Sequence, residues 1–243
     1  MACPQRETSG YALAFETSTA MGAVALGKGS QVLATAVLSR ARAHAAGFLP
    51  AVEDVCREHG VEPRAIEEVY VSCGPGSFTG LRIGITAAKM LALATGARIV
   101  AVPTLEIIAQ NALDAAPRPD RVAVILDAKR QHVYTAPFQW NGQAFVQAAA
   151  PIEADAIAFL CTQPPECAVL GEGVLYHRES IAKAQRRVLP ESLFPPRPET
   201  VYALGDVRAR QGQYTDRRGL IPTYIRPPEA EEVWQRTHTP AGR

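Results

Sequence analysis

The segment CGPGSFTGLRIGITAAKMLALAT, residues 73–95, gives the clearest view of how the first half of this chain folds. It predicts a strand ending at Cys73, a tight turn over Gly74–Thr79, and a helix over Gly80–Thr95 with Thr79 as its N-cap. Free N–H groups at such a helix start can cradle an anion. The glycines can equally serve only to make the turn, because their spacing is that of neither GxxxxGKS/T nor GxGxxG.

The predicted helix Gly80–Thr95 is apolar around its whole circumference. Only Arg82 and Lys89 are charged, which is typical of a helix buried on more than one side. If one face alone packed on the chain's own sheet, about three large aliphatic side chains would stay in water, at roughly 1.5 to 3 kcal/mol each. The helix is therefore either sandwiched inside its own chain or forms a partner surface with a second, amphipathic helix predicted at Ala45–His59.

The sequence on either side of these helices predicts a first α/β lobe that begins with strands. Short apolar and β-branched runs separated by Gly-rich breaks indicate an antiparallel meander. The predicted strands are Tyr11–Glu16, Gly22–Leu26, Gln31–Ser39, Glu68–Cys73 and Arg98–Val102, followed by a helix from Thr104 to Leu113.

The segment Pro117–Asp120 is the first that indicates a joint between lobes. We therefore expect a first lobe over residues 1–116 and a second, smaller α/β lobe over 117–243, whose C-terminal helix packs back on the first. Strand-first order in both halves favours an α/β duplication over a doubly wound sheet. The second lobe's predicted elements are strands Arg121–Asp127, Val133–Trp140, Gln143–Gln147 and Cys167–Leu170, helices Glu153–Cys161 and Val201–Gln211, and a Pro-rich loop at Leu189–Pro198.

Composition excludes several classes of protein. The 243 residues include 25 Lys and Arg against 24 Asp and Glu, and are 47% hydrophobic, which rules out a disordered or collagen-like chain and argues against a protein that mainly coats phosphates. Five cysteines without a CxxC pair fit a reducing compartment. The longest stretch free of charged residues is interrupted by Gln and Asn, so no membrane span is expected. We expect a cytoplasmic protein.

The string GPGSFTGLRIGITAAKMLA resembles the signature of the bacterial TsaB family, also called YeaZ, part of the machinery that makes threonylcarbamoyladenosine beside the tRNA anticodon. Similar family segments recur in the right order along nearly the whole chain. They are ETSTAMGAVAL at 16–26, His44 to Pro50, AVPTLEIIAQ at 101–110, DAKRQHVY at 127–134 and PTYIRPPEAE at 222–231.

The resemblance implies the two-lobed actin-like and sugar-kinase ATPase (ASKHA) fold. In active members of that superfamily an acidic residue on the first strand of each lobe positions Mg²⁺ and the phosphates. Glu16 and Asp127 occupy these places here, with Thr17 and Ser18 beside them. Because Glu16 replaces the usual Asp, and only Gly171–Gly173 could form a second phosphate loop, we expect a degenerate phosphate site with no catalytic residue and no cofactor.

A metal site finds little support in the sequence. The catalytic paralogue TsaD carries two metal-binding histidines one helical turn apart, whereas here His44 is followed one turn later by Phe48. The basic clusters lack interleaved aromatic residues, so we expect solvated faces and not direct tRNA contacts. They are Arg186, Arg187, Arg208, Arg210, Arg217 and Arg218.

The resemblance implies a non-catalytic subunit that binds and activates a TsaD-like enzyme, which modifies tRNAs that read codons starting with A. Further expected partners are a TsaE-like ATPase within the complex, tRNA only indirectly, and a second copy when the chain is isolated. The alternatives are an ATP-dependent enzyme of the sugar-kinase-like fold and, less favoured, a metallopeptidase-like protein. The predicted partner interface comprises Phe48, Val52, Val55, Ile83, Ala87 and Met90.

Overall fold

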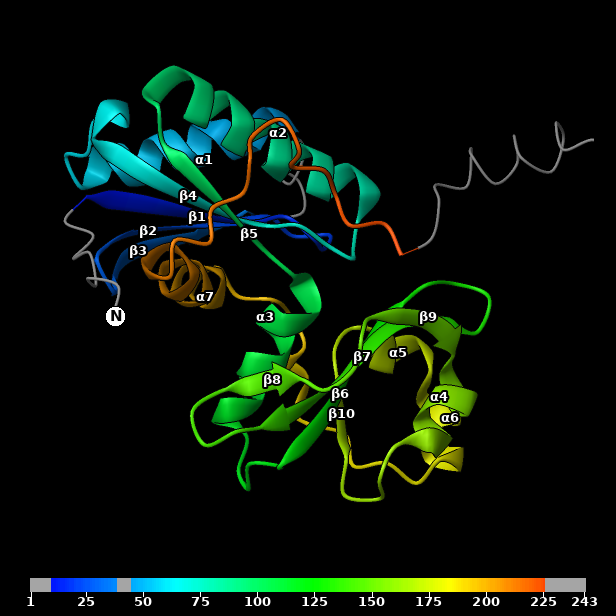
Figure 1. Cartoon of the computed structure of the whole chain (residues 1–243). Helices are drawn as coiled ribbons and strands as arrows, with labels where there is room; N and C mark the ends of the chain where they lie inside the picture. Colours follow the sequence, from blue (N-terminus) through cyan, green and yellow to red (C-terminus); the bar gives the residue numbers. More distant parts are fainter. Residues whose placement is uncertain (1–9, 39–44, 226–243) are drawn as a thin grey trace, which may run out of the picture.

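The computed structural model describes residues 10–38 and 45–225, which form two α/β lobes, each with its own five-stranded sheet (Figure 1). In the first sheet the strand order is β3-β2-β1-β4-β5. The antiparallel meander predicted from the sequence is confirmed: β1 pairs antiparallel with β2, and β2 with β3, while β1, β4 and β5 run parallel. The strands are β1 Tyr11–Glu16, β2 Ala23–Lys28, β3 Gln31–Val37, β4 Ile66–Ser72 and β5 Arg98–Val102.

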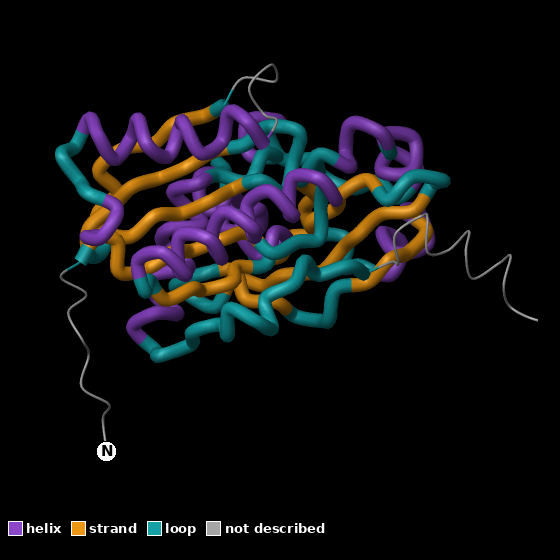
Figure 2. The backbone as a smooth tube through the Cα atoms, turned by 90° about the horizontal axis from the view of Figure 1, so that it is seen from above, coloured by secondary structure: helices purple, strands orange, loops and turns teal. Residues whose placement is uncertain are grey.

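Helices cover both faces of this first sheet. Helices α1 (Ala45–Glu58) and α2 (Phe78–Thr95) lie over one face, and α7 (Pro198–Arg210) lies over the other (Figure 1; Figure 2). Strand β1 is buried on both sides because its alternate residues enter two different cores. Leu13 and Phe15 face α1 and α2, whereas the alanines at 12 and 14 face α7.

Helix α7 belongs to the second half of the sequence but packs on the first sheet. Tyr202 on α7 meets Tyr70 on β4 edge to face, with ring centroids 5.3 Å apart. The helix comes this close because a Cβ at Gly205 would lie 2.2 Å from the Tyr70 side chain. The C-terminal helix therefore joins the two halves of the chain.

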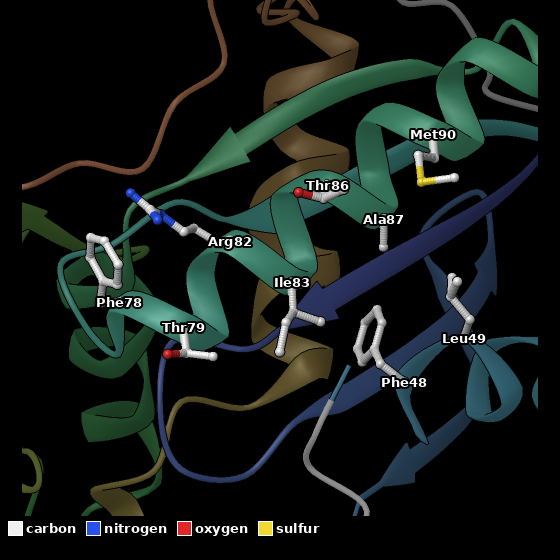
Figure 3. A pocket seen from close by; sticks show the side chains of 9 residues that line it. All are labelled: Phe48, Leu49, Phe78, Thr79, Arg82, Ile83, Thr86, Ala87 and Met90. Atoms are coloured by element: carbon white, nitrogen blue, oxygen red, sulfur yellow. The ribbon is translucent and has the colours of Figure 1, made fainter. Parts of the chain in front are cut away.

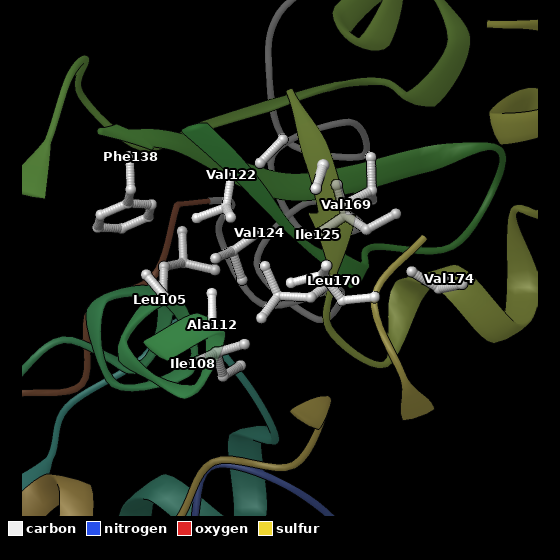
Figure 4. Packing of buried hydrophobic residues seen from close by; sticks show 14 of the residues in the cluster. Leu105, Ile108, Ala112, Val122, Val124, Ile125, Phe138, Val169, Leu170 and Val174 are labelled. Atoms are coloured by element: carbon white, nitrogen blue, oxygen red, sulfur yellow. The ribbon is translucent and has the colours of Figure 1, made fainter. Parts of the chain in front are cut away.

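The second sheet has the order β10-β6-β7-β8, with β9 paired to β7. Its core lies between β6 and helix α3, whose Leu105 and Ile108 pack against the sheet (Figure 4). Gln110 fixes α3 to β8 through both a donated and an accepted bond with the Phe145 backbone, of 2.7 and 3.0 Å. The elements are α3 Thr104–Gln110, β6 Arg121–Asp127, β7 His132–Trp140, β8 Phe145–Gln147, β9 Ile152–Asp155, α4 Ala156–Thr162, β10 Ala168–Leu170, α5 Gly173–Tyr176 and α6 Arg178–Lys183.

Three sequence-based expectations are wrong in detail. Helix α2 begins at Phe78 and is capped by Ser77, whose Oγ accepts from the Gly80 N–H at 3.2 Å, so Thr79 is not the N-cap. The helix predicted from Glu153 begins only at Ala156, because the Asp155 side chain caps it there and the residues before it pair with β7. The Pro-rich loop contains a short 3-10 turn over Glu191–Leu193.

The chain after α7 crosses back over the first lobe, and we call residues 212–225 the C-terminal strap. Thr215 pairs with Ile99 on the edge strand β5, and the Thr223 N–H donates to the Cys73 carbonyl at 2.7 Å. The strap then reaches the start of α2, where the Tyr224 and Phe78 rings lie 5.4 Å apart. His44, residues 226–231 of the family segment and the rest of the C-terminus lie outside the described residues.

No helix in the described part of the chain is both long enough and apolar enough to cross a membrane.

Candidate functional site

The loop after β1 carries the first candidate phosphate position, and its carboxylate bonds to its own loop. Glu16 is only 1% exposed, and its Oε1 accepts from the Ser18 backbone N–H at 2.6 Å and from the Ser18 hydroxyl at 2.5 Å. Its Oε2 is buried without a partner in the described structure. Burial raises the pKa of the Glu16 carboxyl to about 7, against the smaller lowering effect of the Ser18 bonds.

The glycines of residues 76–84 allow the start of α2 to lie directly on this loop. A Cβ at Gly80 would lie 2.0 Å from the Thr17 carbonyl oxygen, and one at Gly84 would lie 2.2 Å from the Thr17 hydroxyl. The Ser77 N–H, which could have faced an anion, donates to the Ser18 carbonyl at 2.7 Å. Of the two interpretations left open by the sequence, the structure supports close packing of chain on chain over an anion cradle.

The second candidate phosphate position is also tied into its own lobe. Asp127 ends β6, and its Oδ1 lies 3.0 Å from Nε2 of His177 and accepts from the Lys129 N–H at 3.2 Å. The His177 side chain is almost fully buried, and its Nδ1 has no partner in the described structure. This bond fastens the junction between α5 and α6 to the end of β6.

The loop Gly171–Gly173 has a packing reason for its glycines. A Cβ at Gly171 would lie 2.4 Å from the Ile125 carbonyl oxygen, and one at Gly173 would lie 2.9 Å from the same atom. Between them, burial is the main cause that raises the pKa of the Glu172 carboxyl, and the nearby Asp127 adds to it. An acidic, half-buried side chain in the middle of this loop is poorly suited to a phosphate.

Metal-ligating residues do not gather within residues 10–38 and 45–225: these hold no group of three or more His, Cys, Asp or Glu side chains suited to a metal ion.

An apolar groove of about 430 Å³ lies between the start of α1 and the outer face of α2 (Figure 3). Its floor is Phe48, whose ring meets that of Phe15 edge to face at 5.1 Å. We call this feature the α1/α2 groove. It is lined by Phe48, Leu49, Phe78, Thr79, Arg82, Ile83, Thr86, Ala87 and Met90.

The predicted interface residues divide into two groups in the structure. Phe48, Ile83, Ala87 and Met90 line the α1/α2 groove, although Phe48 is only 2% exposed. Val52 and Val55 do not line the groove. They are buried in the first lobe's core, because they lie on the face of α1 that packs on the sheet.

Of the exposed apolar side chains on this surface, the predicted interface includes Met90, which is 59% exposed, but not Leu93, which is 70% exposed. Leu49 and Phe78 are also exposed and absent from the predicted set. Positions 78, 82, 86, 90 and 93 follow helical spacing along one outward stripe of α2, so the period was present in the sequence. The alternative in which α2 is sandwiched inside its own chain is wrong for the described residues.

Most of the arginines in the basic clusters serve the fold. The Arg186 guanidinium donates to three carbonyls at and beyond the end of α4, of Leu160, Gln163 and Pro164. Arg208 pairs with Glu106, and Arg210 pairs with Asp206. These groups are therefore engaged within the chain.

Two strand-first α/β lobes, with an acidic residue at the end of the first strand of each, define a protein of the actin-like and sugar-kinase ATPase fold. The chain matches over residues 31–234 the family described as TsaD, tRNA N6-adenosine threonylcarbamoyltransferase. It superimposes with a TM-score of 0.75 on YeaZ from Pseudomonas aeruginosa, with 28% identity, covering 88% of this chain and all of that one.

Similarity to curated proteins identifies the family within this fold. The chain is 30% identical over 228 residues to the tRNA threonylcarbamoyladenosine biosynthesis protein TsaB of Bacillus subtilis, covering 91% of this chain and 96% of that protein. It is 36% identical over 137 residues to the protein of the same name in Escherichia coli, covering 54% and 58%. The chain belongs to the TsaB (YeaZ) family of tRNA threonylcarbamoyladenosine modification.

Proposed function

We propose that this chain is a non-catalytic subunit that binds a TsaD-like enzyme through the α1/α2 groove and activates it. The proposal rests on one combination of features: the α1/α2 groove is apolar and open, while the carboxylates of Glu16 and Asp127, at the candidate phosphate positions, already bond to groups within the chain. In this proposal the enzyme transfers the threonylcarbamoyl group to adenosine in tRNAs that read codons starting with A. A TsaE-like ATPase joins the complex in the cytoplasm, and this chain meets tRNA only through its partners.

The candidate phosphate residues support a role without catalysis. A carboxylate that positions Mg²⁺ must keep at least one oxygen free to face the metal or its bound water. Here one Glu16 oxygen bonds to Ser18, the other is buried without a partner in the described structure, and Oδ1 of Asp127 is engaged by His177. Moving either carboxylate to a nucleotide would break these bonds. The family description names a transferase, whereas the B. subtilis and E. coli relatives are named as biosynthesis proteins TsaB.

The α1/α2 groove supports a role in binding. Full burial of a large apolar side chain contributes about 1.5 to 3 kcal/mol, and Leu49, Met90 and Leu93 are each at least half exposed, so each offers about 1 kcal/mol. Arg82 and Thr86 place polar groups at the edge of this apolar centre, as in most specific interfaces. In the isolated chain the same surface is available to a second copy.

Co-purification with the TsaD-like partner tests this proposal. Ile83→Glu places a charge in the groove and should abolish co-purification, because the charge would be buried unpaired. Val146→Glu is the matched control, since Val146 is an exposed valine on β8 in the other lobe. Circular dichroism must show both variants folded. Retained binding by a folded Ile83→Glu chain removes the groove from the interface.

A further inference from the structure

Arg82 lies at one end of the α1/α2 groove, where two aromatic side chains hold it. Its guanidinium lies 3.7 Å from the centre of the Phe78 ring, and its Nε donates to the Tyr224 hydroxyl at 3.2 Å. Figure 3 shows Phe78 and Arg82 together at the start of α2, with Met90 toward the other end of the groove. Because these two contacts already orient the exposed guanidinium, it loses little side-chain entropy when it binds a further group.

Tyr224 is itself held in place, because the C-terminal strap is fastened to the first lobe on both sides of the edge strand β5. The Tyr214 hydroxyl donates to the buried Glu68 carboxylate at 2.8 Å, near the beginning of the strap. Next to Tyr224, the Thr223 N–H donates to the Cys73 carbonyl at 2.7 Å. The strap therefore positions the Tyr224 hydroxyl against Arg82.

The other donors of Arg82 face outward without a partner. Within residues 10–38 and 45–225 its guanidinium has no acidic partner and no hydrogen-bond acceptor besides Tyr224. Among the described residues that line the groove, only Arg82 is charged. A partner that covers the groove takes this guanidinium partly out of water, and a desolvated charge without a counter-charge is strongly unfavourable. The partner is therefore expected to bring the counter-charge.

The chemistry of the groove favours a carboxylate as that counter-charge. Two parallel N–H donors of a guanidinium match the two oxygens of a carboxylate, and they match a phosphate equally well. A nucleic-acid backbone, however, is bound by several cations along the strand, whereas the described lining of this groove offers one. The apolar side chains beside Arg82 instead suit a protein surface that carries an acidic residue among apolar ones.

We propose that Arg82 binds a carboxylate on the surface of the TsaD-like enzyme, and that Tyr224 is a positioning residue for its guanidinium. The inference rests on the proposed function and adds the chemistry of the contact to it. Apolar packing along the rest of the groove contributes most of the affinity. The ion pair fixes the orientation of the partner and excludes surfaces that are basic at the same place.

The affinity of the full chain for the TsaD-like enzyme, measured by isothermal titration at several NaCl concentrations, tests this proposal. Arg82→Gln should weaken binding roughly 10- to 100-fold and make it less sensitive to salt, because the ion pair is lost. Arg82→Lys should give an intermediate affinity, since it keeps the charge and loses the planar fork. Lys89→Gln is the matched control, a cation of α2 outside the groove, and should bind like the wild type.

A double-mutant cycle tests the positioning role of Tyr224. Tyr224→Phe keeps the ring beside Phe78 and removes the hydroxyl that accepts from Arg82. It should weaken binding in the wild type and have no further effect in the Arg82→Gln chain. Equal losses in the two backgrounds would mean that Tyr224 acts on the fold and not through Arg82, and would overturn its positioning role.

Two results would overturn the carboxylate contact. In one, a folded Arg82→Gln chain binds the enzyme as tightly as the wild type, or with the same salt dependence. In the other, Arg82→Gln leaves enzyme binding unchanged and weakens binding of tRNA in a gel-shift assay, so that the acceptor is a phosphate. Either result is distinguishable from failure of the proposed function, because Ile83→Glu would still abolish co-purification with the enzyme.

Discussion

The carboxyl group of Glu16 provides a quantitative test of the self-bonded phosphate loop. Burial raises its pKa from 4.5 to about 7. The folded chain therefore holds this proton more tightly than the unfolded chain does. The resulting stabilisation is complete below pH 4.5 and is lost as the pH rises through 7. At about 1.4 kcal/mol per pH unit, the loss reaches at most about 3 kcal/mol.

The substitution Glu16→Gln removes this titration and keeps an oxygen for the two Ser18 bonds. An amide in place of the unpartnered Oε2 has its own cost, of about 1 to 3 kcal/mol, but that cost is the same at every pH. The comparison is therefore the change in unfolding free energy between pH 5 and pH 8. The wild type should lose up to about 2.5 kcal/mol more than the variant over this interval, since part of the loss already lies below pH 5.

Urea unfolding followed by circular dichroism at pH 5, 6, 7 and 8 measures this difference. Glu58→Gln is the matched control, because Glu58 is an exposed carboxyl at the end of α1, and its pH dependence should follow the wild type. If Glu16→Gln shows the same pH dependence as the wild type, the carboxyl is not buried as the structure describes, and the argument that this loop encloses its own carboxylate fails.

Two further predictions concern the same loop and the absence of nucleotide chemistry. Gly84→Ala should destabilise the chain by about 1 to 3 kcal/mol in urea unfolding, because the new Cβ meets Thr17, whereas helix propensity alone would stabilise it by about 1 kcal/mol. Thr86→Ala, on the exposed side of α2, is the control. A Gly84→Ala chain that is more stable than the wild type would disprove the close approach of α2 to Thr17. Isothermal titration should detect no Mg-ATP binding to the isolated chain, and stoichiometric binding that disappears in Glu16→Ala and Asp127→Ala would instead support the ATP-dependent enzyme.

Local sequence signals located the sheets well. The strands β5 and β6 have the predicted bounds, since β-branched runs flanked by Gly, Pro or Asp leave little choice of end. The sequence predicts the start of α2 two residues late because Ser77 and Thr79 are both good caps. In the structure Ser77 is the cap, and its N–H donates to the distant Ser18 carbonyl. The helix predicted from Glu153 overlaps the strand β9, because this strand forms by pairing with β7, which lies elsewhere in the sequence.

The candidate site was harder to predict because it depends on which way each helix faces. The apolar residues of α1 and α2 look alike in sequence, yet Val52 and Val55 are buried and Leu49 and Leu93 are exposed. Which apolar residues are buried depends on which face of each helix packs on the sheet, and a local sequence pattern does not contain that information. The glycines around Gly80 also gave no hint that their partner is Thr17, more than sixty residues earlier in the sequence.

Reconstitution of tRNA modification tests the central claim most directly. The TsaD-like enzyme, threonylcarbamoyl adenylate and substrate tRNA are incubated with and without this chain, and threonylcarbamoyladenosine is measured by mass spectrometry of the digested tRNA. We expect modification to require the chain, to fail with Ile83→Glu, and to proceed fully with Glu16→Gln and Asp127→Asn. Full modification without the chain, or loss of modification in either carboxylate variant that still binds the enzyme, would contradict a subunit that supplies binding surface and no chemistry.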